Sequence, residues 1–468
     1  MKKKYDIIVI GAGSGGLNIA VFMQKAGFKV LLIDKSDKSI GGDCLNFGCV
    51  PSKALIHTSR IVHAASKSKE FGLSIKGEVN LKRIERYIHS KKEVIRKHEN
   101  ATHFRKMGMD VILGHAKFVS KDEITVNEEV YQGKKIVIAT GSSPRKLEIP
   151  GIENVRYHTN ETIFQETNLP KQMITIGGGP IGIELGQAYQ RLGAQVTVVH
   201  RGKQCLPKED SDISKGLKEQ LASEGMRIIL ESEPVKCVGT NKLVIRAKDG
   251  SQKTLPFDSL LVSIGRTLNI NSLDLDKAGI KTENKKLVLN DYLQTTNKRV
   301  YAIGDVVGSY QFTHAAELHA GIILTNFFSP FKKKVNYDNL SWVTYTQPEV
   351  ATFGLQEPTL KERNIDYKVL DYSFDEDDRA IVDGATYGRL KLFVSKNKLL
   401  GGTMLAENAG ELIQELILAN SVGLSIKTLF NKVYPYPTAS RTNKRAIQLH
   451  FLNKLNPFSK KILKLFYH

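Results

Sequence analysis

Two cysteines, Cys44 and Cys49, follow a glycine-rich stretch of the kind that binds a dinucleotide. On an undistorted helix, residues at this spacing lie farther apart than the roughly 4.4–6.8 Å between Cα atoms that a disulfide needs. Gly48 permits the local distortion that would bring the two sulfurs together. Because a crosslink that closes so short a loop restricts the unfolded chain little, reversible oxidation explains the pair better than stabilisation does. Two neighbouring buried free thiols are the alternative.

The residues before this pair predict a nucleotide-binding unit. An apolar strand over 5–10, a glycine turn, a helix over 17–26 and a strand over 29–33 follow one another. This order rests a pyrophosphate on the N-terminus of a helix. Asp34, at the end of the second strand, can accept hydrogen bonds from a ribose diol. The glycines that permit the turn, admit the phosphates and let helix and strand pack are Gly11, Gly13 and Gly16.

The same unit recurs later in the chain, with strands over 173–176 and 195–199 and a helix over 183–192. Two copies in full strand, turn and helix context are far more specific than one. Where the first copy has a carboxylate, the second has His200 followed by Arg201, and a cation there accommodates a 2′-phosphate. The second unit is therefore predicted to prefer NADPH, with NADH as the alternative. Its glycines are Gly177, Gly179 and Gly182.

Composition predicts a cytoplasmic enzyme of several domains. The chain has 468 residues, of which 41% are apolar and 25% charged, and this length exceeds one core. Four cysteines do not make a secreted disulfide scaffold, and Cys205 and Cys237 are read as free thiols. Lysines at the N-terminus imitate a secretory signal, but Asp6 and the following glycines interrupt it. We find no apolar run long enough for a membrane span.

The positive charge is concentrated at the C-terminus. The formal net charge is +20, and no acidic residue follows Glu415. Residues 449–468 combine lysines with phenylalanine, leucine and isoleucine, a pattern that suits a basic amphipathic helix on an anionic membrane or against a partner. A terminal helix packed on its own protein is the alternative. No nucleic-acid-binding motif accompanies the charge, so no nucleic-acid partner is expected.

Three further segments complete a family pattern. They are 136–141, which contains Thr140 and Gly141; 261–266, which contains Gly265; and 300–305, which ends in Asp305. With the two nucleotide units and the cysteine pair, they make the chain resemble the class I pyridine nucleotide-disulfide oxidoreductases. These flavoenzymes include lipoamide dehydrogenase, glutathione reductase and mercuric reductase. The resemblance covers nearly the whole chain.

The resemblance implies an α/β protein with two Rossmann-like domains, one for FAD and one for NAD(P), and a C-terminal α+β dimerisation domain. It implies that the FAD-binding domain has a first part in 1–150 and a second, central part in 268–335. The NAD(P)-binding domain is expected in 151–267, and the dimerisation domain with its basic tail in 336–468. A homodimer follows from the last of these.

The resemblance also implies roles for individual residues. Cys49 is expected to face the flavin and Cys44 to meet the substrate. Lys53 is expected beside the flavin, where a cation stabilises the negative charge that arrives with a hydride, and Glu184 is its charge partner. A solvated helix carboxylate is the alternative for Glu184. The FAD-binding set comprises Gly11, Gly13, Gly16, Asp34, Thr140, Gly141 and Asp305, the last on the ribityl chain, and the NAD(P) set comprises Gly177, Gly179, Gly182, His200, Arg201 and Gly265.

One segment departs from the family pattern. Enzymes of the family that turn over dithiols carry a His-Pro-Thr-x-Ser-Glu type segment, whereas this chain has Tyr436 in place of the histidine and Arg441 in place of the glutamate. Tyrosine, with a pKa near 10, exchanges protons poorly at neutral pH, so slow turnover of dihydrolipoamide or glutathione disulfide is expected. Mercuric reductase also carries tyrosine there. The terminal cysteine pair and the preceding metal-binding domain of that enzyme are not found in this sequence.

The sequence thus predicts an FAD-dependent NAD(P)H oxidoreductase, mercuric-reductase-like, that reduces a soft metal ion or an unidentified disulfide or quinone-like acceptor. A dihydrolipoamide dehydrogenase or glutathione reductase type of enzyme is one alternative. A flavin-binding redox sensor, recruited to a membrane or partner by its basic tail, is an alternative of another class. No resident metal site is predicted, since His314, Glu317 and His319 are read as the start of a helix under the flavin.

Overall fold

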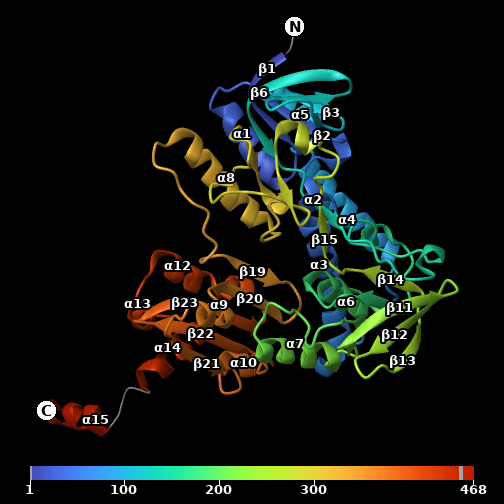
Figure 1. Ribbon diagram of the computed structural model, residues 1–468. Coiled ribbons are helices and arrows are strands. Elements are labelled where there is room, and N and C mark those ends of the chain that lie inside the picture. The colour runs from blue at the N-terminus through green and yellow to red at the C-terminus, as the bar shows by residue number, and fades with distance from the viewer. Residues whose placement is uncertain (1–2, 453–456, 468) are drawn as a thin grey trace.

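The structure is a computed structural model that describes residues 3–452 and 457–467. Its first sheet has seven strands, in the order β3-β2-β1-β6-β5-β4, with β18 paired to β6 (Figure 1). The buried stretches 7–10, 30–33 and 136–138 of its parallel strands are apolar, as expected for strands covered on both faces. Their bounds are β1 Lys3–Ile10, β2 Val30–Asp34, β3 Asp110–Leu113, β4 Lys117–Phe118, β5 Glu123–Val126, β6 Glu129–Ile138 and β18 Val300–Ala302.

The second sheet is parallel, in the order β10-β9-β8-β14, and a three-stranded antiparallel sheet follows it in the chain. Helices α6 (Pro180–Leu192) and α7 (Ser211–Ser223) pack against the parallel sheet. The strands are β8 Gln172–Ile176, β9 Gln195–Val199, β10 Arg227–Ile229, β14 Ser259–Val262, and β11 Ser232–Val238, β12 Lys242–Ala247 and β13 Gln252–Pro256. A short ladder of β7 (Ser142–Pro144) and β15 (Arg266–Leu268) connects this region to the first sheet.

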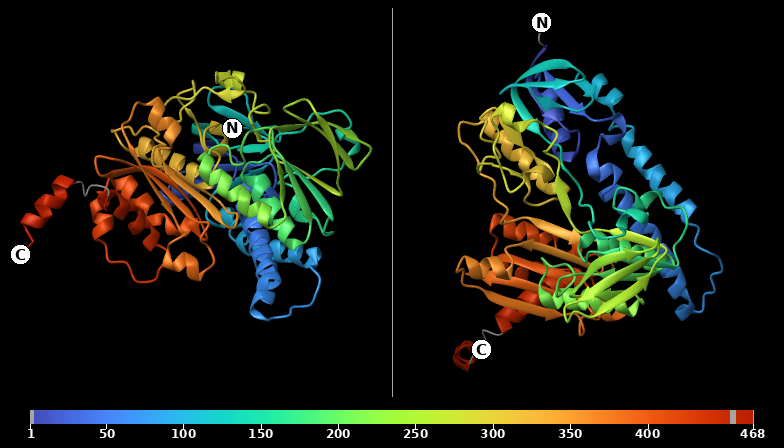
Figure 2. Two further views of the ribbon diagram at one scale, coloured as in Figure 1. Left: turned by 90° about the horizontal axis from the view of Figure 1, so that it is seen from below. Right: turned by 45° about the vertical axis from the view of Figure 1, so that its right-hand side comes forward.

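The third sheet is antiparallel, in the order β19-β20-β23-β22-β21, and helices cover it. Figure 2 shows this layer beside the second sheet and away from the N-terminus. The elements are β19 Ser341–Thr344, β20 Glu349–Gly354, β21 Lys368–Ser373, β22 Arg389–Ser395, β23 Lys398–Ala406, α9 Glu357–Glu362, α10 Asp378–Val382, α11 Ala409–Leu412, α12 Gln414–Val422, α13 Ile426–Asn431 and α14 Arg441–Leu452. Two Rossmann-like units and an α+β unit confirm the predicted fold class.

Helix packing joins the first unit to the second. α3 (Cys49–Lys67) packs on both α6 and α4 (Leu81–Arg96), and α8 (Thr313–Phe328) packs on α1 (Ser14–Lys25). The nucleotide-unit helices begin earlier than predicted, at Ser14 and Pro180, because residues read as the turn already have helical backbone. The remaining elements are α2 Gly42–Asn46, α5 Ala101–Lys106, β16 Thr282–Glu283, β17 Lys286–Leu287 and short 3₁₀ turns.

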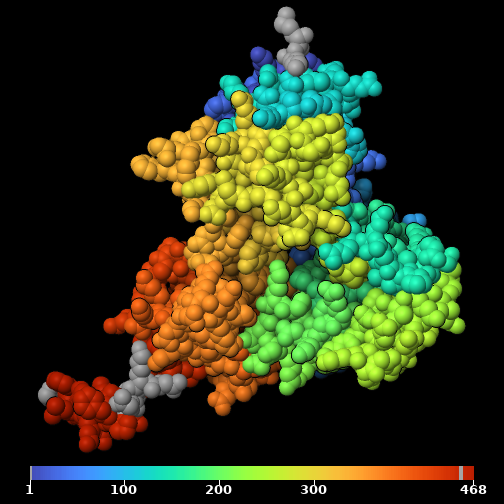
Figure 3. Space-filling view, viewed as in Figure 1, coloured from blue at the N-terminus to red at the C-terminus, as the bar shows by residue number. Residues whose placement is uncertain are grey.

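The C-terminal helix α15 (Pro457–Leu465) buries none of its residues. It projects beyond the body of the molecule in Figure 3, at the lower left. α14, by contrast, packs on the third sheet and buries Ala446 and Ile447. The described part of the chain contains no helix long and apolar enough to cross a membrane.

Candidate functional site

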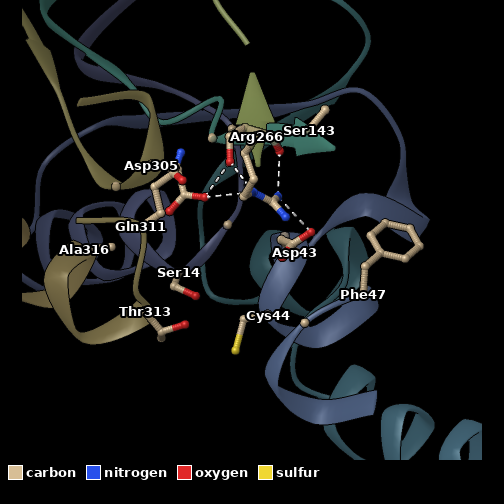
Figure 4. A pocket seen from close by; sticks show the side chains of 18 of the residues that line it. Ser14, Asp43, Cys44, Phe47, Ser143, Arg266, Asp305, Gln311, Thr313 and Ala316 are labelled. Carbon is tan, nitrogen blue, oxygen red and sulfur yellow. Dashed lines mark hydrogen bonds and ion pairs between the residues drawn. The ribbon is translucent and has the colours of Figure 1, made fainter. Parts of the chain in front are cut away.

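A cavity of about 1000 Å³ lies where the first nucleotide unit, α2, α3 and the N-terminus of α8 meet. Figure 4 shows part of its wall, where Arg266 lies between Asp43 and Asp305 and the side chain of Cys44 points away from these three. Ten of the predicted site residues line it: Gly11, Gly13, Asp34, Cys44, Cys49, Lys53, Thr140, Gly141, Glu184 and Asp305. Residues far apart in the sequence are therefore brought to one site.

The two cysteines lie on either side of a break between helices. Cys44 is in α2, which ends at Asn46, and Cys49 is the first residue of α3. Gly48 in the break has φ −118° and ψ −112°, so the helix is interrupted where the sequence predicted a distortion. Both residues are free thiols in this structure, and a hydrogen-bonding interaction between them shifts their pKa values in opposite directions.

The environment of the pair makes the two thiols unequal. The hydrogen bond to Cys49 and burial raise the pKa of Cys44. The same hydrogen bond lowers the pKa of Cys49, and Thr313, whose Oγ1 lies 3.5 Å from Cys49 Sγ, and the charge of Lys53 lower it further. Cys49 is therefore the thiol that loses its proton first, and thiolate is the form that reacts and binds metals.

Lys53 and Glu184 form an ion pair inside the cavity. Lys53 Nζ lies 2.8 Å from Glu184 Oε2, and Glu184 is 7% exposed. The Tyr345 backbone N–H donates to Glu184 Oε1 at 2.9 Å, and the Lys53 ammonium lies 4.1 Å from the centre of the Tyr345 ring. The solvated helix carboxylate considered for Glu184 does not describe this buried, paired group. Glu184 and the Tyr345 ring hold the ammonium of Lys53, which lies one helical turn after Cys49 on α3.

The first glycine turn fits the diphosphate of FAD. A Cβ on Gly11 would lie 2.3 Å from Ala139 O, and one on Gly16 would lie 2.0 Å from Gly11 O, so neither position admits a side chain. Asp34 accepts the Ala12 backbone N–H at 2.7 Å at the end of β2. Together with the volume of the cavity, this closely packed turn could hold a dinucleotide along the N-terminus of α1.

The far side of this cavity is polar. Thr140 Oγ1 donates to Asn269 O at 2.7 Å, and Ser142 Oγ donates to Asp305 Oδ2 at 2.6 Å. Burial raises the pKa of Asp305, although Ser142 and the charge of Arg266 oppose that effect. Gly141 has φ +67°, a conformation that favours glycine. These residues could hold the ribityl chain that the family resemblance assigns to Asp305.

The second glycine turn has the same construction. A Cβ on Gly177 would lie 2.3 Å from Ser263 O, one on Gly182 would lie 2.1 Å from Gly177 O, and nothing lies within 4 Å of a Cβ on Gly179. Gly265, with φ +109°, follows β14 at the edge of the same sheet. A dinucleotide diphosphate therefore fits the N-terminus of α6 as it fits that of α1.

His200 occupies the position in the second unit that Asp34 occupies in the first, but it carries no negative charge. Its Nδ1 accepts the Gly178 backbone N–H at 3.2 Å, as Asp34 accepts the N–H of Ala12. Its Nε2 is buried without a hydrogen-bond partner in residues 3–452 and 457–467. Burial and the charge of Arg201 lower the pKa of His200, so the ring is neutral near pH 7. The positive charge expected at this place is therefore that of the exposed Arg201.

Tyr436 lies outside the cavity of its own chain. It is 67% exposed on the third unit, its OH lies 3.4 Å from Asp378 Oδ2, and the guanidinium of Arg441 lies 4.9 Å from its ring centre. A role for Tyr436 at the thiols would need a second copy of the chain. His319 lies within α8, as predicted, where its Nδ1 accepts the Gly304 N–H at 3.2 Å.

The cavity residues that were not predicted include Asp43, Arg266, Thr313 and Tyr345. Asp43 directly precedes Cys44, and Arg266 directly follows Gly265 in the segment 261–266. Charged residues beside a thiol and at the end of a buried strand are a signal that could have identified these two. Thr313 and Tyr345 carry no such signal, because only the fold places them beside Cys49 and Lys53.

Comparison with known proteins gives consistent matches. The sequence profile of the pyridine nucleotide-disulphide oxidoreductases matches residues 5–320, and that of their dimerisation domain matches residues 340–447. The chain is 35% identical to a mercuric reductase of Lysinibacillus sphaericus, over 94% of this chain and 82% of that one. It is 33% identical to a dihydrolipoyl dehydrogenase of Thermus scotoductus, over 97% and 100%.

Among solved structures, the HOCl-induced flavoprotein disulfide reductase RclA from Escherichia coli superposes with a TM-score of 0.84. The two sequences are 26% identical, and the match covers 95% of this chain and all of RclA. A Cu(II) complex of RclA matches with the same TM-score.

The unequal thiols lead to a first prediction. Cys44→Ala removes the hydrogen bond to Cys49, so the pKa of Cys49 should rise. In the reduced protein, the pH at which alkylation of Cys49 by iodoacetamide is half-maximal should move upward, as followed by mass spectrometry of the Cys49 peptide. Cys237→Ala, which removes a distant buried thiol, should leave that pH unchanged. An unchanged pH in Cys44→Ala would show that Cys44 does not set the acidity of Cys49.

Proposed function

The chain belongs to the pyridine nucleotide-disulphide oxidoreductase family, and on that premise we propose that it reduces a soft metal ion held by Cys44 and Cys49. It is an FAD-dependent oxidoreductase that uses NAD(P)H, as mercuric reductases and dihydrolipoyl dehydrogenases of the family are. The match to the dimerisation domain supports a homodimer. The proposal concerns the acceptor and the residues that serve it.

The observation that carries the proposal is the paired sulfurs, one of which has a lowered pKa, on the wall of the cavity. Soft thiolates select soft metal ions, and binding a metal releases the remaining thiol proton. Tyr436, in place of a histidine, gives no efficient proton exchange for a dithiol substrate. Mercuric reductases are among the relatives, and RclA has been solved as a Cu(II) complex.

The residues of the chain divide the work. When bound, FAD supplies the two-electron chemistry that connects a nicotinamide with a thiol pair. Glu184 and the Tyr345 ring hold the Lys53 ammonium in the cavity, where it favours negative charge nearby. Cys44 holds the shared proton and Cys49 the negative charge until a metal ion replaces the proton between them. The thiols, Lys53 and Glu184 are the catalytic residues of this proposal, with Tyr436 contributed by the second subunit.

A disulfide substrate is the second candidate, since dihydrolipoyl dehydrogenases match over the whole length of the chain. A redox sensor would bind flavin and nicotinamide without steady turnover. One panel of acceptors separates the three candidates.

We predict that the FAD-loaded enzyme oxidises NADPH faster with mercury(II) or copper(II) than with lipoamide, glutathione disulfide or a quinone. Cys44→Ala and Cys49→Ala should each lower the metal-dependent rate by at least about a hundredfold, because each removes one of two ligands. Absorbance of NADPH measures the rate, and Cys237→Ala is the matched control. Fastest turnover with lipoamide would favour the disulfide reductase, and no turnover with any acceptor would favour the sensor.

We further propose that NADPH is preferred over NADH. The neutral His200 cannot accept both ribose hydroxyls as a carboxylate would, because its Nδ1 already accepts the Gly178 N–H. Arg201 adds the exposed charge that suits a 2′-phosphate.

Arg201→Glu should therefore lower kcat/KM for NADPH by about tenfold or more and change that for NADH little. Affinity for 2′,5′-ADP, measured by calorimetry, should fall in parallel. Lys236→Glu makes the same change of charge on β11 of this unit and serves as the control. Equal losses for the two nucleotides would mean that Arg201 does not contact the 2′-phosphate.

A contact between α15 and an anionic membrane surface is also proposed. The i, i+4, i+7 set Phe458, Ile462 and Leu465 shares one face of this helix, with Lys460 and Lys464 on the opposite side and Lys461 at its edge. None of these residues is buried against the body of the chain, so a helix packed on its own chain is not what is observed. Exposed aromatic residues opposite lysines suit the boundary of an anionic bilayer. The lysines are Lys460, Lys461 and Lys464.

The full-length protein should therefore sediment with phosphatidylglycerol vesicles and not with phosphatidylcholine vesicles, and salt should weaken the binding. Lys460→Glu with Lys464→Glu should abolish sedimentation. Lys427→Glu with Lys444→Glu changes the charge equally on α13 and α14 and should not. If the α15 variant instead alters the oligomeric state in light scattering and vesicle binding is unaffected, the helix contacts a second copy of the chain.

A further inference from the structure

Arg266 connects three segments in the wall of the cavity (Figure 4). Its side chain is 10% exposed, and one of its terminal nitrogens lies 3.1 Å from Asp43 Oδ1. Its Nε donates to Ser142 Oγ at 2.6 Å and lies 3.6 Å from Asp305 Oδ2. A second N–H donates to the Ser142 carbonyl at 2.9 Å. Arg266 therefore lies between one carboxylate on α2 and another at the far wall.

Asp43 contacts both ends of the turn that separates the two thiols. It directly precedes Cys44, and its carbonyl accepts the Phe47 N–H at 2.8 Å. Its Oδ2 would lie 3.0 Å from a Cβ on Gly48, which directly precedes Cys49. Oδ1 also accepts Asn160 Nδ2 at 3.3 Å. The carboxylate thus packs beneath the turn and is held from outside it.

We propose that Asp43 is a positioning residue, which acts through Arg266 to hold the turn between Cys44 and Cys49 against the Ser142 and Asp305 wall. Phe47 makes the last hydrogen bond of α2, and at Gly48 the backbone leaves the helical conformation before α3 begins, so the turn needs an external support. The guanidinium of Arg266 is planar, always charged and supplies several hydrogen-bond donors at once. Arg266 is the first residue of strand β15, which holds its backbone in place. Held in this way, the two sulfurs keep the mutual approach that forming a disulfide requires.

The inference rests on Cys44 and Cys49 being the redox pair of the proposed function, but it is independent of the acceptor. A purely electrostatic role for Asp43 makes a different prediction. The charge of Asp43 raises the pKa of Cys49. If that were its whole effect, removing the charge would stabilise the Cys49 thiolate and favour the dithiol, whereas removing the positive charge of Arg266 would act in the opposite direction.

The test measures how readily the disulfide forms, without NADPH or acceptor. The FAD-loaded, full-length protein is equilibrated anaerobically with glutathione buffers, in which reduction of one protein disulfide oxidises two glutathione molecules to one glutathione disulfide. Alkylation and mass spectrometry of the peptides with Cys44 and Cys49 give the equilibrium constant. Asp43→Ala should shift it toward the dithiol by about fivefold or more, and Arg266→Met should do the same. The double variant should shift it no further than the larger single effect.

Arg389→Met removes another paired arginine, the partner of Asp371 on the third sheet, and should leave the equilibrium unchanged. Asp43→Asn and Arg266→Lys keep most of the side-chain volume. They replace Asp43→Ala and Arg266→Met in the test if thermal unfolding shows that those two variants do not fold. Both should give shifts in the same direction and of smaller size. An unchanged equilibrium in Asp43→Asn and Arg266→Lys, or additive shifts in the double variant, would overturn the proposal. A failed acceptor panel would leave this equilibrium measurable, so the two proposals fail separately.

Discussion

The close approach of two sulfur atoms with unequal acidity is the interaction on which the site depends. Cys44 and Cys49 are hydrogen-bonded to each other because α2 stops at Asn46 and α3 starts at Cys49, with a break of two residues between them. When the pair loses its first proton, one thiolate remains beside one thiol. The thiolate is both the nucleophile and the metal ligand. The surrounding cavity, the ion pair in it and the helices that carry it all serve to hold that arrangement.

The buried charged groups of this site are stabilised because each has a partner from another unit. Glu184 on α6 meets Lys53 on α3 and the backbone of Tyr345 at the end of the third sheet. Arg266, at the end of the second unit, meets Asp43 on α2 and Asp305 beyond β18. An unpaired carboxylate or guanidinium in these places would be costly, so each pair also fixes how the three units approach one another.

The sequence predicted what is local, and the structure was needed for what is not. The glycine turns follow from short motifs, because the backbone conformation and close approach at Gly11, Gly16 and Gly177 admit no other residue. The predicted helices of the two nucleotide units start three residues late, because the last residues of each glycine turn also form the first turn of the helix. The neutral state of His200 depends on burial, which spacing alone does not reveal. Tyr345 and Arg266 act only after distant segments meet, and Tyr436 acts, on the family pattern, only beside a second copy.

The pairing of β18 with β6 has a consequence for synthesis on the ribosome. The first sheet takes strands from residues 3–138 and then a last parallel strand from residues 300–302, while all strands of the second parallel sheet lie between residues 172 and 262. The later sheet can therefore close as soon as its own residues have emerged. The earlier one must wait with an unpaired edge, exposed to wrong partners, until some 300 residues have been translated.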